Sequence, residues 1–368
     1  MSAPWFEIAN AGEVPSPALL IYADRVEENI RRMIAMAGGV ERLRPHLKTH
    51  KLAEVLRMQM AHGINKFKCA TIAEAEMAAD AGAGDLLLAY QPVGPNIDRL
   101  LELVARHPGV RFSCVADNAS SIADLSDGAV AAGTSLEVLL DLDLGQHRTG
   151  LAPERALYLY RFLATKPALI PGGLHAYDGH LHQSDVAERA SACEAAFEPV
   201  KSLRQELLRE GLPVPRVIAG GTPTFPMHAR RADVECSPGT CIFWDAGYAH
   251  NLPDLDFLPA AVLLTRVVSK PLPGRLCLDL GHKAVASEMA HPRVVFLNLE
   301  DARPVMHNEE HLVVETPQAE RFAVGDVIHA IPWHICPTVA LHEEVVVVRD
   351  GRAGERWRPV ARRRALTI

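Results

Sequence analysis

KFKCATIAEAEMAADAGAGDLLLA, residues 66–89, is the stretch that decides the fold. A short apolar run at 66–70 precedes helical spacing over 72–81, and a second apolar run follows at 85–89. Strands that alternate with helices and lack a polar face are typical of a parallel sheet covered by helices. This stretch therefore predicts an α/β architecture.

The same pairing repeats from about Ala18 to Trp244. The other strands that we predict are 18–22, 111–115, 136–142, 168–175 and 217–219, and the helices are 25–37, 96–106, 119–132, 154–165 and 184–211. About eight such units favour a closed TIM-type (β/α)8 barrel over an open sheet. No GxGxxG motif follows the first strand, which argues against a dinucleotide-binding fold.

The pattern changes near Phe257, where segments rich in β-forming residues are separated by Pro, Gly and Asp. The strands predicted there are 261–268, 275–280, 293–299, 311–315 and 343–348. Because helical spacing is weak in this part, it predicts a mostly antiparallel β domain. The expected organisation is a barrel over residues 15–255 and a β domain over residues 256–368, joined by an N-terminal strand within residues 1–14, at Trp5–Asn10.

Composition narrows the class of function. The 368 residues are 48% hydrophobic and carry a formal net charge of -7, with both signs of charge mixed along the chain. This mixing argues against nucleic acid or a membrane surface as the main partner and favours a small molecule. The chain has no signal-peptide pattern and no apolar run of about 18 residues, so we expect a cytoplasmic protein. Its seven cysteines form no CxxC pair, which argues against a disulfide framework and a zinc ribbon.

Lys48 lies among histidines and cations in the sequence RPHLKTHK, residues 44–51. Burial and neighbouring cations both disfavour an ammonium group, so a lysine in this setting can attack a carbonyl. Lys48 is therefore a candidate for Schiff-base chemistry. The alternative is a solvated loop lysine.

Polar residues cluster after the later barrel strands, at the end of the strands where barrel active sites lie. Residues 175–182, HAYDGHLH, place His175, Tyr177, His180 and His182 close together. A histidine there can act as a base or a ligand, and a tyrosine can stack on a planar cofactor. A single histidine in such a segment is more often a hydrogen-bonded structural residue, but the cluster favours function.

Two loops after consecutive late strands contain glycine and hydroxyl residues, GGTPT at 220–224 and SPGT at 237–240. Backbone N–H groups and hydroxyls in such loops bind phosphate in many barrels. Each loop taken alone is equally consistent with a tight turn.

His334 and Cys336 lie two residues apart in PWHICPT, residues 332–338. If this segment is extended, both side chains project to the same side and can bind one metal ion, with sulfur favouring zinc. The alternative is a buried structural cysteine.

In combination, RPHLKTHK, DLGQHRTG, GLHAYDGH, AGGTPT, SPGT and HICPTV resemble the D-threonine aldolase and D-serine dehydratase group. These are fold-type III pyridoxal phosphate enzymes, related through the barrel to alanine racemase, and the resemblance runs from about Pro15 to Val348. It implies pyridoxal 5'-phosphate and a divalent metal, zinc or manganese with magnesium also possible. It further implies a D-amino acid substrate and a homodimer.

The resemblance also implies roles for single residues. Lys48 is the Schiff-base lysine, and His180 is the base beside the substrate, with His175 and His182 left as alternatives. Arg148 lies near the phenolic oxygen of the cofactor and the substrate carboxylate, and Tyr177 stacks near the ring. The implied phosphate cradle is Gly221, Thr222, Gly239 and Thr240, and the implied metal pair is His334 and Cys336.

The activity implied first is that of a lyase on D-β-hydroxy-α-amino acids, a D-threonine aldolase that releases glycine and an aldehyde. Cys336 takes a position where an aspartate is expected in aldolases, and it resembles the dehydratase arrangement. A dehydratase of D-serine or D-threo-3-hydroxyaspartate is therefore the alternative. An amino-acid racemase would keep Lys48 without needing His334 and Cys336, and a noncatalytic cofactor carrier is disfavoured by the β domain.

Overall fold

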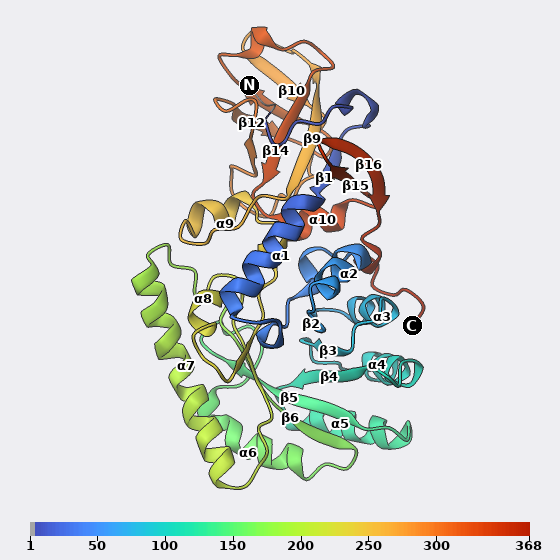
Figure 1. Ribbon diagram of the computed structural model, residues 1–368, viewed down its shortest axis with the longest axis vertical. Helices are drawn as coiled ribbons and strands as arrows, with labels where there is room; N and C mark the ends of the chain where they lie inside the picture. Colours follow the sequence, from blue (N-terminus) through green and yellow to red (C-terminus); the bar gives the residue numbers. More distant parts are fainter. Residues whose placement is uncertain (1–3) are drawn as a thin grey trace. The chain divides into compact units, whose positions relative to one another are not determined.

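The computed structural model describes residues 4–368, and Figure 1 follows the chain from blue at its start to red at its end. The chain forms two compact units. Among the described residues, the barrel unit comprises 33–48, 55–239 and 361–368, and the β unit comprises 4–32, 49–54 and 240–360. No helix among the described residues is long and apolar enough to cross a lipid bilayer.

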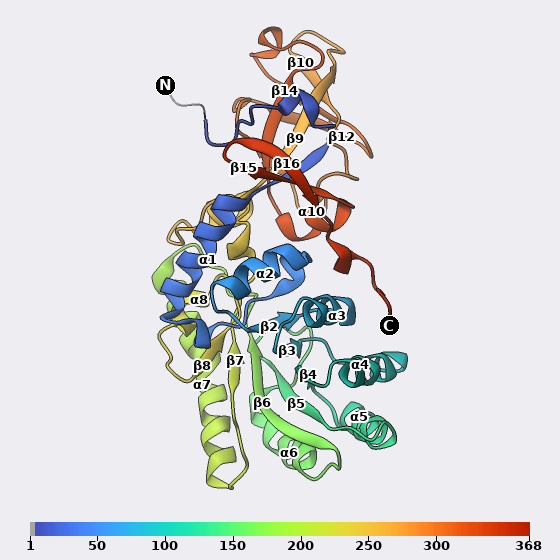
Figure 2. The same ribbon diagram turned by 45° about the vertical axis from the view of Figure 1, so that its right-hand side comes forward.

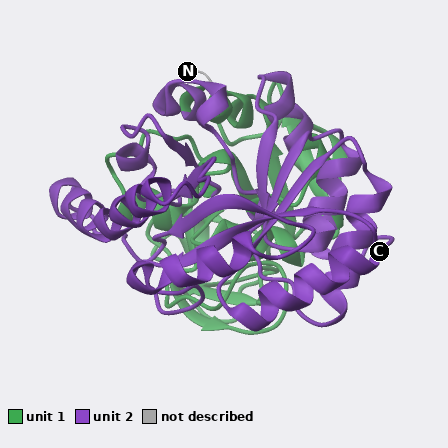
Figure 3. Ribbon diagram, turned by 90° about the horizontal axis from the view of Figure 1, so that it is seen from below, with its two compact units in different colours: residues 1–32, 49–54, 240–360 green, residues 33–48, 55–239, 361–368 purple. Residues whose placement is uncertain are grey.

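The barrel unit contains seven parallel strands that lie side by side in chain order (Figure 2). The strands are β2 (Lys66–Cys69), β3 (Asp85–Leu88), β4 (Arg111–Ala116), β5 (Leu136–Asp143), β6 (Leu169–Tyr177), β7 (Val217–Ala219) and β8 (Val234–Cys236). The helices between them are α3 (Ile72–Asp80), α4 (Pro95–Arg106), α5 (Ala119–Ala131), α6 (Pro153–Ala164), α7 (Val186–Arg209) and α8 (Phe225–His228). Figure 3 shows the strands of this unit surrounded by its helices.

Residues 43–46 close the sheet by lying between β8 and β2. The Arg44 backbone N–H donates to the Cys236 carbonyl (2.9 Å), and the Lys68 N–H donates to the Pro45 carbonyl (2.9 Å). This closing segment takes the place of an eighth strand, although it forms single bridges rather than a regular ladder. The prediction of a TIM-type barrel is thereby confirmed.

Apolar side chains from several strands fill the barrel interior. Leu87, Val115, Leu139 and Ile218 form one buried cluster, with one residue each from β3, β4, β5 and β7. Layers of this kind make such barrels packed cores rather than pores. The packing of this cluster therefore helps to fix the strands whose carboxyl ends carry the polar residues.

The β unit is built on a nine-stranded sheet with the order β12-β13-β10-β9-β1-β15-β16, in which β14 pairs with β9 and β11 pairs with β14. Only the β1–β15 pair among these described strands is parallel. The strands are β1 (Ala18–Tyr22), β9 (Ala261–Ser269), β10 (Arg275–Leu278), β11 (Val294–Phe296), β12 (Arg303–His307), β13 (Leu312–Glu315), β14 (Val327–Pro332), β15 (Val345–Arg349) and β16 (Arg352–Trp357). Two short helices, α9 (Ala246–Asn251) and α10 (Ile335–Leu341), also lie in it, and α1 (Ala23–Ala37) and α2 (Ala53–Ala61) have residues in both units.

Two expectations for the N-terminal part are corrected. Residues 18–22 do form a strand, but it pairs with β9 and β15 rather than joining the barrel. Residues 5–10 contain turns instead of a strand. They meet β16 and the turn before it through one backbone hydrogen bond, from the Ala9 N–H to the Gly351 carbonyl, and through the Asn10 side chain, which binds the backbone of Ala353.

Candidate active site

A cavity of about 630 Å³ lies at the carboxyl ends of β2 to β5 in the barrel unit. Its polar lining includes Lys48, Asp141, Arg148 and Thr149, and its apolar lining includes Val115 of the interior cluster. Since active sites of such barrels are built at this end of the strands, the cavity is the candidate active site.

Barrel closure fixes the position of Lys48. The residue lies in a 3₁₀ turn, Leu47–Thr49, directly after the closing segment. His46 is held by its N–H donating to the Pro238 carbonyl (2.8 Å), and its Nδ1 accepts from the Lys48 backbone N–H (3.3 Å). The lysine therefore enters the cavity from anchored backbone rather than from a solvated loop.

Three basic side chains converge on the ring of Tyr177, which ends β6. The ring centre lies 5.8 Å from Lys48 Nζ, 5.4 Å from Lys68 Nζ and 5.2 Å from Arg148 Cζ. Cations at such distances are attracted to the face of an aromatic ring. The site therefore combines an aromatic platform with positive charge, which suits a planar anionic ligand.

Lys68 is a site residue that the sequence reasoning missed. It lies on β2 and is 2% exposed, and burial followed by the nearby Lys48 cation lowers its pKa to about 7. The signal in the sequence is a lysine between Phe67 and Cys69 in the predicted barrel strand KFKC, where a buried charge is costly unless it serves a ligand or partner.

The structure distinguishes the three clustered histidines. His175 is buried on β6, and its Nδ1 lies 2.7 Å from Asp141 Oδ1 on the adjacent β5. Its Nε2 and the Nδ1 of His180 are buried and have no hydrogen-bond partner among the described residues. His182 is exposed, and its Nδ1 lies 2.7 Å from the His180 carbonyl oxygen.

His180 packs against the loop that carries Arg148. A Cβ at Gly145 would lie 3.2 Å from His180 Nε2, so glycine leaves room for the imidazole there. Burial lowers the pKa of His175, while Asp141 opposes that shift. Among the three histidines, His180 is therefore the one that lies against the Arg148 loop and also has a buried ring nitrogen without a hydrogen-bond partner among the described residues.

The two glycine loops follow the neighbouring parallel strands β7 and β8 and meet as expected. The Gly239 N–H donates to Thr222 Oγ1 (3.2 Å), and a Cβ at Gly221 would lie 3.1 Å from the Tyr177 ring. Gly221 of the expected cradle thus lies against the aromatic platform, and Thr222 and Gly239 of the same cradle contact each other. Thr240 belongs to the β unit, at the start of the 3₁₀ turn Thr240–Ile242.

The expected geometry of the metal pair is wrong, although its two residues do meet. Residues 332–338 are not extended, because α10 begins at Ile335, which makes His334 its N-cap and Cys336 its second residue. Pro337 fits this first turn, since proline needs no backbone donor there. The Asp245 carboxylate receives the Ile335 N–H (3.0 Å) and anchors the start of the helix.

The imidazole of His334 has two hydrogen-bonding neighbours. Cys336 and Glu288 hydrogen-bond to its imidazole, and with Asp245 they raise its pKa to about 9 against the opposing effect of burial. The Glu288 contact is at Nδ1. A carboxylate at one ring nitrogen is how metal-binding histidines are commonly oriented, with the other nitrogen directed to the metal. An imidazole nitrogen and a cysteine sulfur, which binds metal as the thiolate, fit a borderline-soft divalent ion such as zinc.

Comparison with known proteins identifies the family. Residues 21–246 match the family model "Alanine racemase, N-terminal domain", and residues 260–348 match "Putative serine dehydratase domain". A D-threonine aldolase from Arthrobacter sp is 33% identical over 95% of this chain and 93% of its own length. A 3-hydroxy-D-aspartate aldolase from Paracoccus denitrificans is 30% identical over 95% of this chain and 92% of its own.

The fold is also shared with a solved relative. The crystal structure of D-threonine aldolase from Filomicrobium marinum superposes with a TM-score of 0.89 at 29% identity, covering 98% of this chain and 99% of that one. The chain therefore belongs to the fold-type III pyridoxal phosphate enzymes of the D-threonine aldolase and D-serine dehydratase group.

Proposed function

We propose that this protein is a pyridoxal phosphate- and divalent-metal-dependent lyase that cleaves D-β-hydroxy-α-amino acids, with D-threonine as the first substrate to test. The convergence of Lys48 and Arg148 on the Tyr177 ring, beside a glycine cradle, is the observation that carries the proposal. The two aldolases at 33% and 30% identity support this choice of reaction.

Each cofactor-site residue has a chemical task in this proposal. Lys48 would supply the amine that holds the cofactor through its aldehyde carbon, with release of water. Gly221, Thr222 and Gly239 supply backbone and hydroxyl groups for the phosphate, with Thr240 as the fourth member. Pyridoxal phosphate, when bound, supplies an electron sink for the negative charge that develops at the α-carbon.

The protein then decides which bond at the α-carbon breaks. For retro-aldol cleavage, the proton on the β-hydroxyl oxygen must leave, and the imidazole of His180 is the base that we propose to accept it. The cationic Arg148 orients the substrate by its carboxylate. His334 and Cys336 would hold the divalent metal, whose Lewis acidity favours loss of a hydroxyl proton.

Product analysis tests the proposed reaction. Purified protein with pyridoxal phosphate and zinc or manganese is incubated separately with D-threonine and D-serine, before and after a chelator. We expect glycine and acetaldehyde from D-threonine, because carbon–carbon cleavage yields this pair. If cofactor is bound and neither substrate is consumed, the proposed substrate class is wrong.

A dehydratase is the second candidate, and Cys336 is the observation that favours it. The match of residues 260–348 to a serine dehydratase model points the same way. Ammonia with pyruvate from D-serine, or with 2-oxobutanoate from D-threonine, would establish this reaction in the same assay.

Metal dependence provides a separate prediction. His334→Ala or Cys336→Ala is expected to abolish both activity and its response to added metal, since either change removes a direct ligand. Glu288→Gln should be milder, weakening metal binding by about 10- to 100-fold because it only orients His334. Calorimetric metal titration and activity after chelation measure both effects, with Cys277→Ala on β10 as the cysteine control. Full turnover of His334→Ala without metal would contradict the proposed pair.

We further propose a cytoplasmic homodimer. Six of the seven cysteines are buried, and the chain contains no CxxC pair, which suits a reducing compartment. The proposal of a dimer is based on the resemblance to the D-threonine aldolase and D-serine dehydratase group. A monomeric mass by light scattering, across the concentration range of the activity assay, would contradict it.

A further inference from the structure

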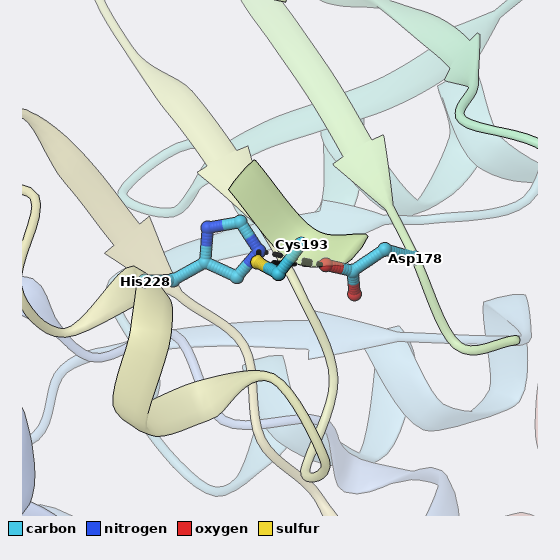
Figure 4. A group of neighbouring side chains, drawn as sticks. All are labelled: Asp178, Cys193 and His228. Carbon is cyan, nitrogen blue, oxygen red and sulfur yellow. Dashed lines mark hydrogen bonds and ion pairs between the residues drawn. The ribbon is translucent and has the colours of Figure 1, made fainter. Parts of the chain in front are cut away.

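A buried cluster outside the cavity joins β6, α7 and α8 (Figure 4). Asp178, Cys193 and His228 are each at most 1% exposed. His228 Nε2 lies 2.8 Å from Asp178 Oδ2, and Cys193 Sγ lies 3.5 Å from His228 Nε2 and 3.8 Å from the same carboxylate oxygen. The three potential ligand atoms lie within 4.8 Å of one another, so their spacing alone would admit a metal ion.

The hydrogen bonds identify this cluster as a polar network rather than a metal site. Arg231 Nη1 lies 3.1 Å from His228 Nδ1, and a guanidinium can only donate. His228 therefore accepts at Nδ1 and carries its proton on Nε2, from which it donates to Asp178. Burial and the adjacent Asp178 raise the pKa of Cys193 to about 11, which disfavours the thiolate within this network.

The network also reaches the proposed cofactor cradle. Asp178 Oδ1 accepts from Thr224 Oγ1 (2.7 Å), which in turn receives the Gly221 N–H (3.4 Å). A Cβ at Gly220 would lie 2.6 Å from His228 Cδ2, so the glycine loop rests directly on the imidazole. Asp178 also follows Tyr177 in the chain, which couples the carboxylate to the aromatic platform.

We propose that Asp178, Thr224 and His228 form a positioning unit that holds the Gly220–Thr222 loop and Tyr177 in place to receive the phosphate of the cofactor. The inference rests on the proposed function, because it assigns a task toward the same cofactor. Asp178 is its hub. Burial alone would raise the pKa of this carboxyl group, but the hydrogen bonds from His228 and Thr224 lower it and keep the group ionised.

Thr224→Val is the sharpest test because it keeps the side-chain volume and removes the hydroxyl that links Asp178 to the glycine loop. The dissociation constants of pyridoxal phosphate and of pyridoxal, which lacks the phosphate, are measured on apoprotein by visible absorbance and fluorescence quenching. We expect Thr224→Val to weaken pyridoxal phosphate binding by about tenfold or more, the scale of a lost charge-assisted contact. Pyridoxal binding should change less than threefold.

Controls separate positioning from general damage. Thr224→Ser, which restores the hydroxyl, should recover most of the phosphate-dependent affinity, and Cys193→Ala should leave it unchanged. Circular dichroism confirms that each variant is folded. A folded Thr224→Val protein with wild-type affinity for both ligands would overturn the inference, as would equal losses for pyridoxal and pyridoxal phosphate.

Two other outcomes are distinct. If the wild-type apoprotein binds no pyridoxal phosphate, the proposed function itself fails. If a His334→Ala protein still takes up one equivalent of zinc, and the further change Cys193→Ser abolishes that uptake, the cluster is a metal site and the positioning role is overturned.

Discussion

Replacing Lys48 by alanine is expected to remove the visible absorbance of bound pyridoxal phosphate and to lower turnover by about 10⁴-fold or more, as loss of a covalent catalyst does. The position of Lys48 supports this expectation together with its chemistry. The Lys48 backbone is anchored to His46, and His46 is anchored to Pro238 at the barrel closure.

Borohydride reduction followed by peptide mass spectrometry measures the attachment directly. In the wild-type protein, the reduced cofactor is expected on the peptide that contains Lys48. Lys51→Ala, in the same motif, serves as the matched control and should keep the absorbance. Lys68 is the informative competitor, since its Nζ lies 5.4 Å from the same tyrosine ring. A reducible bond retained in Lys48→Ala would contradict the assignment, and a modified Lys68 would identify the replacement.

The barrel was predictable because each strand–helix pair is local in sequence. The sheet to which residues 18–22 belong could not be predicted, because a strand followed by a helix has the same sequence pattern in either sheet. The closing segment was hidden for another reason. It contains Pro45 between Arg44 and His46, and neither proline nor alternating charged residues is typical of a central strand.

Part of the candidate site follows from the sequence in the same way. Tyr177 ends a strand and the glycine loops directly follow strands, so their convergence follows from the parallel sheet. The contacts of Asp178 with Thr224 and His228 could not be predicted in this way, because these partners lie 46 and 50 residues away in sequence. The α10 helix was missed because His334 and Cys336 were considered as an isolated pair, whereas Asp245 supplies the acceptor that starts the helix.

Arg44 connects the closing segment to two barrel strands through buried ion pairs. Its side chain is fully buried, with Nε 2.7 Å from Glu235 on β8 and Nη1 2.7 Å from Asp85 on β3. Its Nη2 lies 3.0 Å from the second oxygen of Asp85. This paired geometry satisfies a buried guanidinium that would otherwise be very costly.

Arg44→Met is therefore expected to lower the free energy of unfolding by about 3–5 kcal/mol, because Asp85 and Glu235 lose a buried counter-charge. Urea unfolding of the apoprotein followed by circular dichroism measures the change. Arg161→Met is the matched control, since its pair with Glu210 is half exposed and should contribute less than about 1 kcal/mol. A deficit in Arg44→Met no larger than that of the control would contradict a structural role for the buried pairs.

The pH dependence of the stability lost in Arg44→Met distinguishes a contribution of the Arg44 charge from a contribution of its packing. Burial raises the pKa of Asp85 and Glu235, but contacts with Arg44 and neighbouring cations outweigh it and hold both below their ordinary values of 3.8 and 4.5. Carboxyl groups with lowered pKa values stabilise the fold above those ordinary values, and this stabilisation is lost as pH falls through the folded-state pKa. The wild-type protein should therefore lose stability in acid more steeply than Arg44→Met, so the deficit narrows below about pH 4. A deficit that stays constant from pH 7 to pH 3 would instead indicate that Arg44 stabilises the closure by packing.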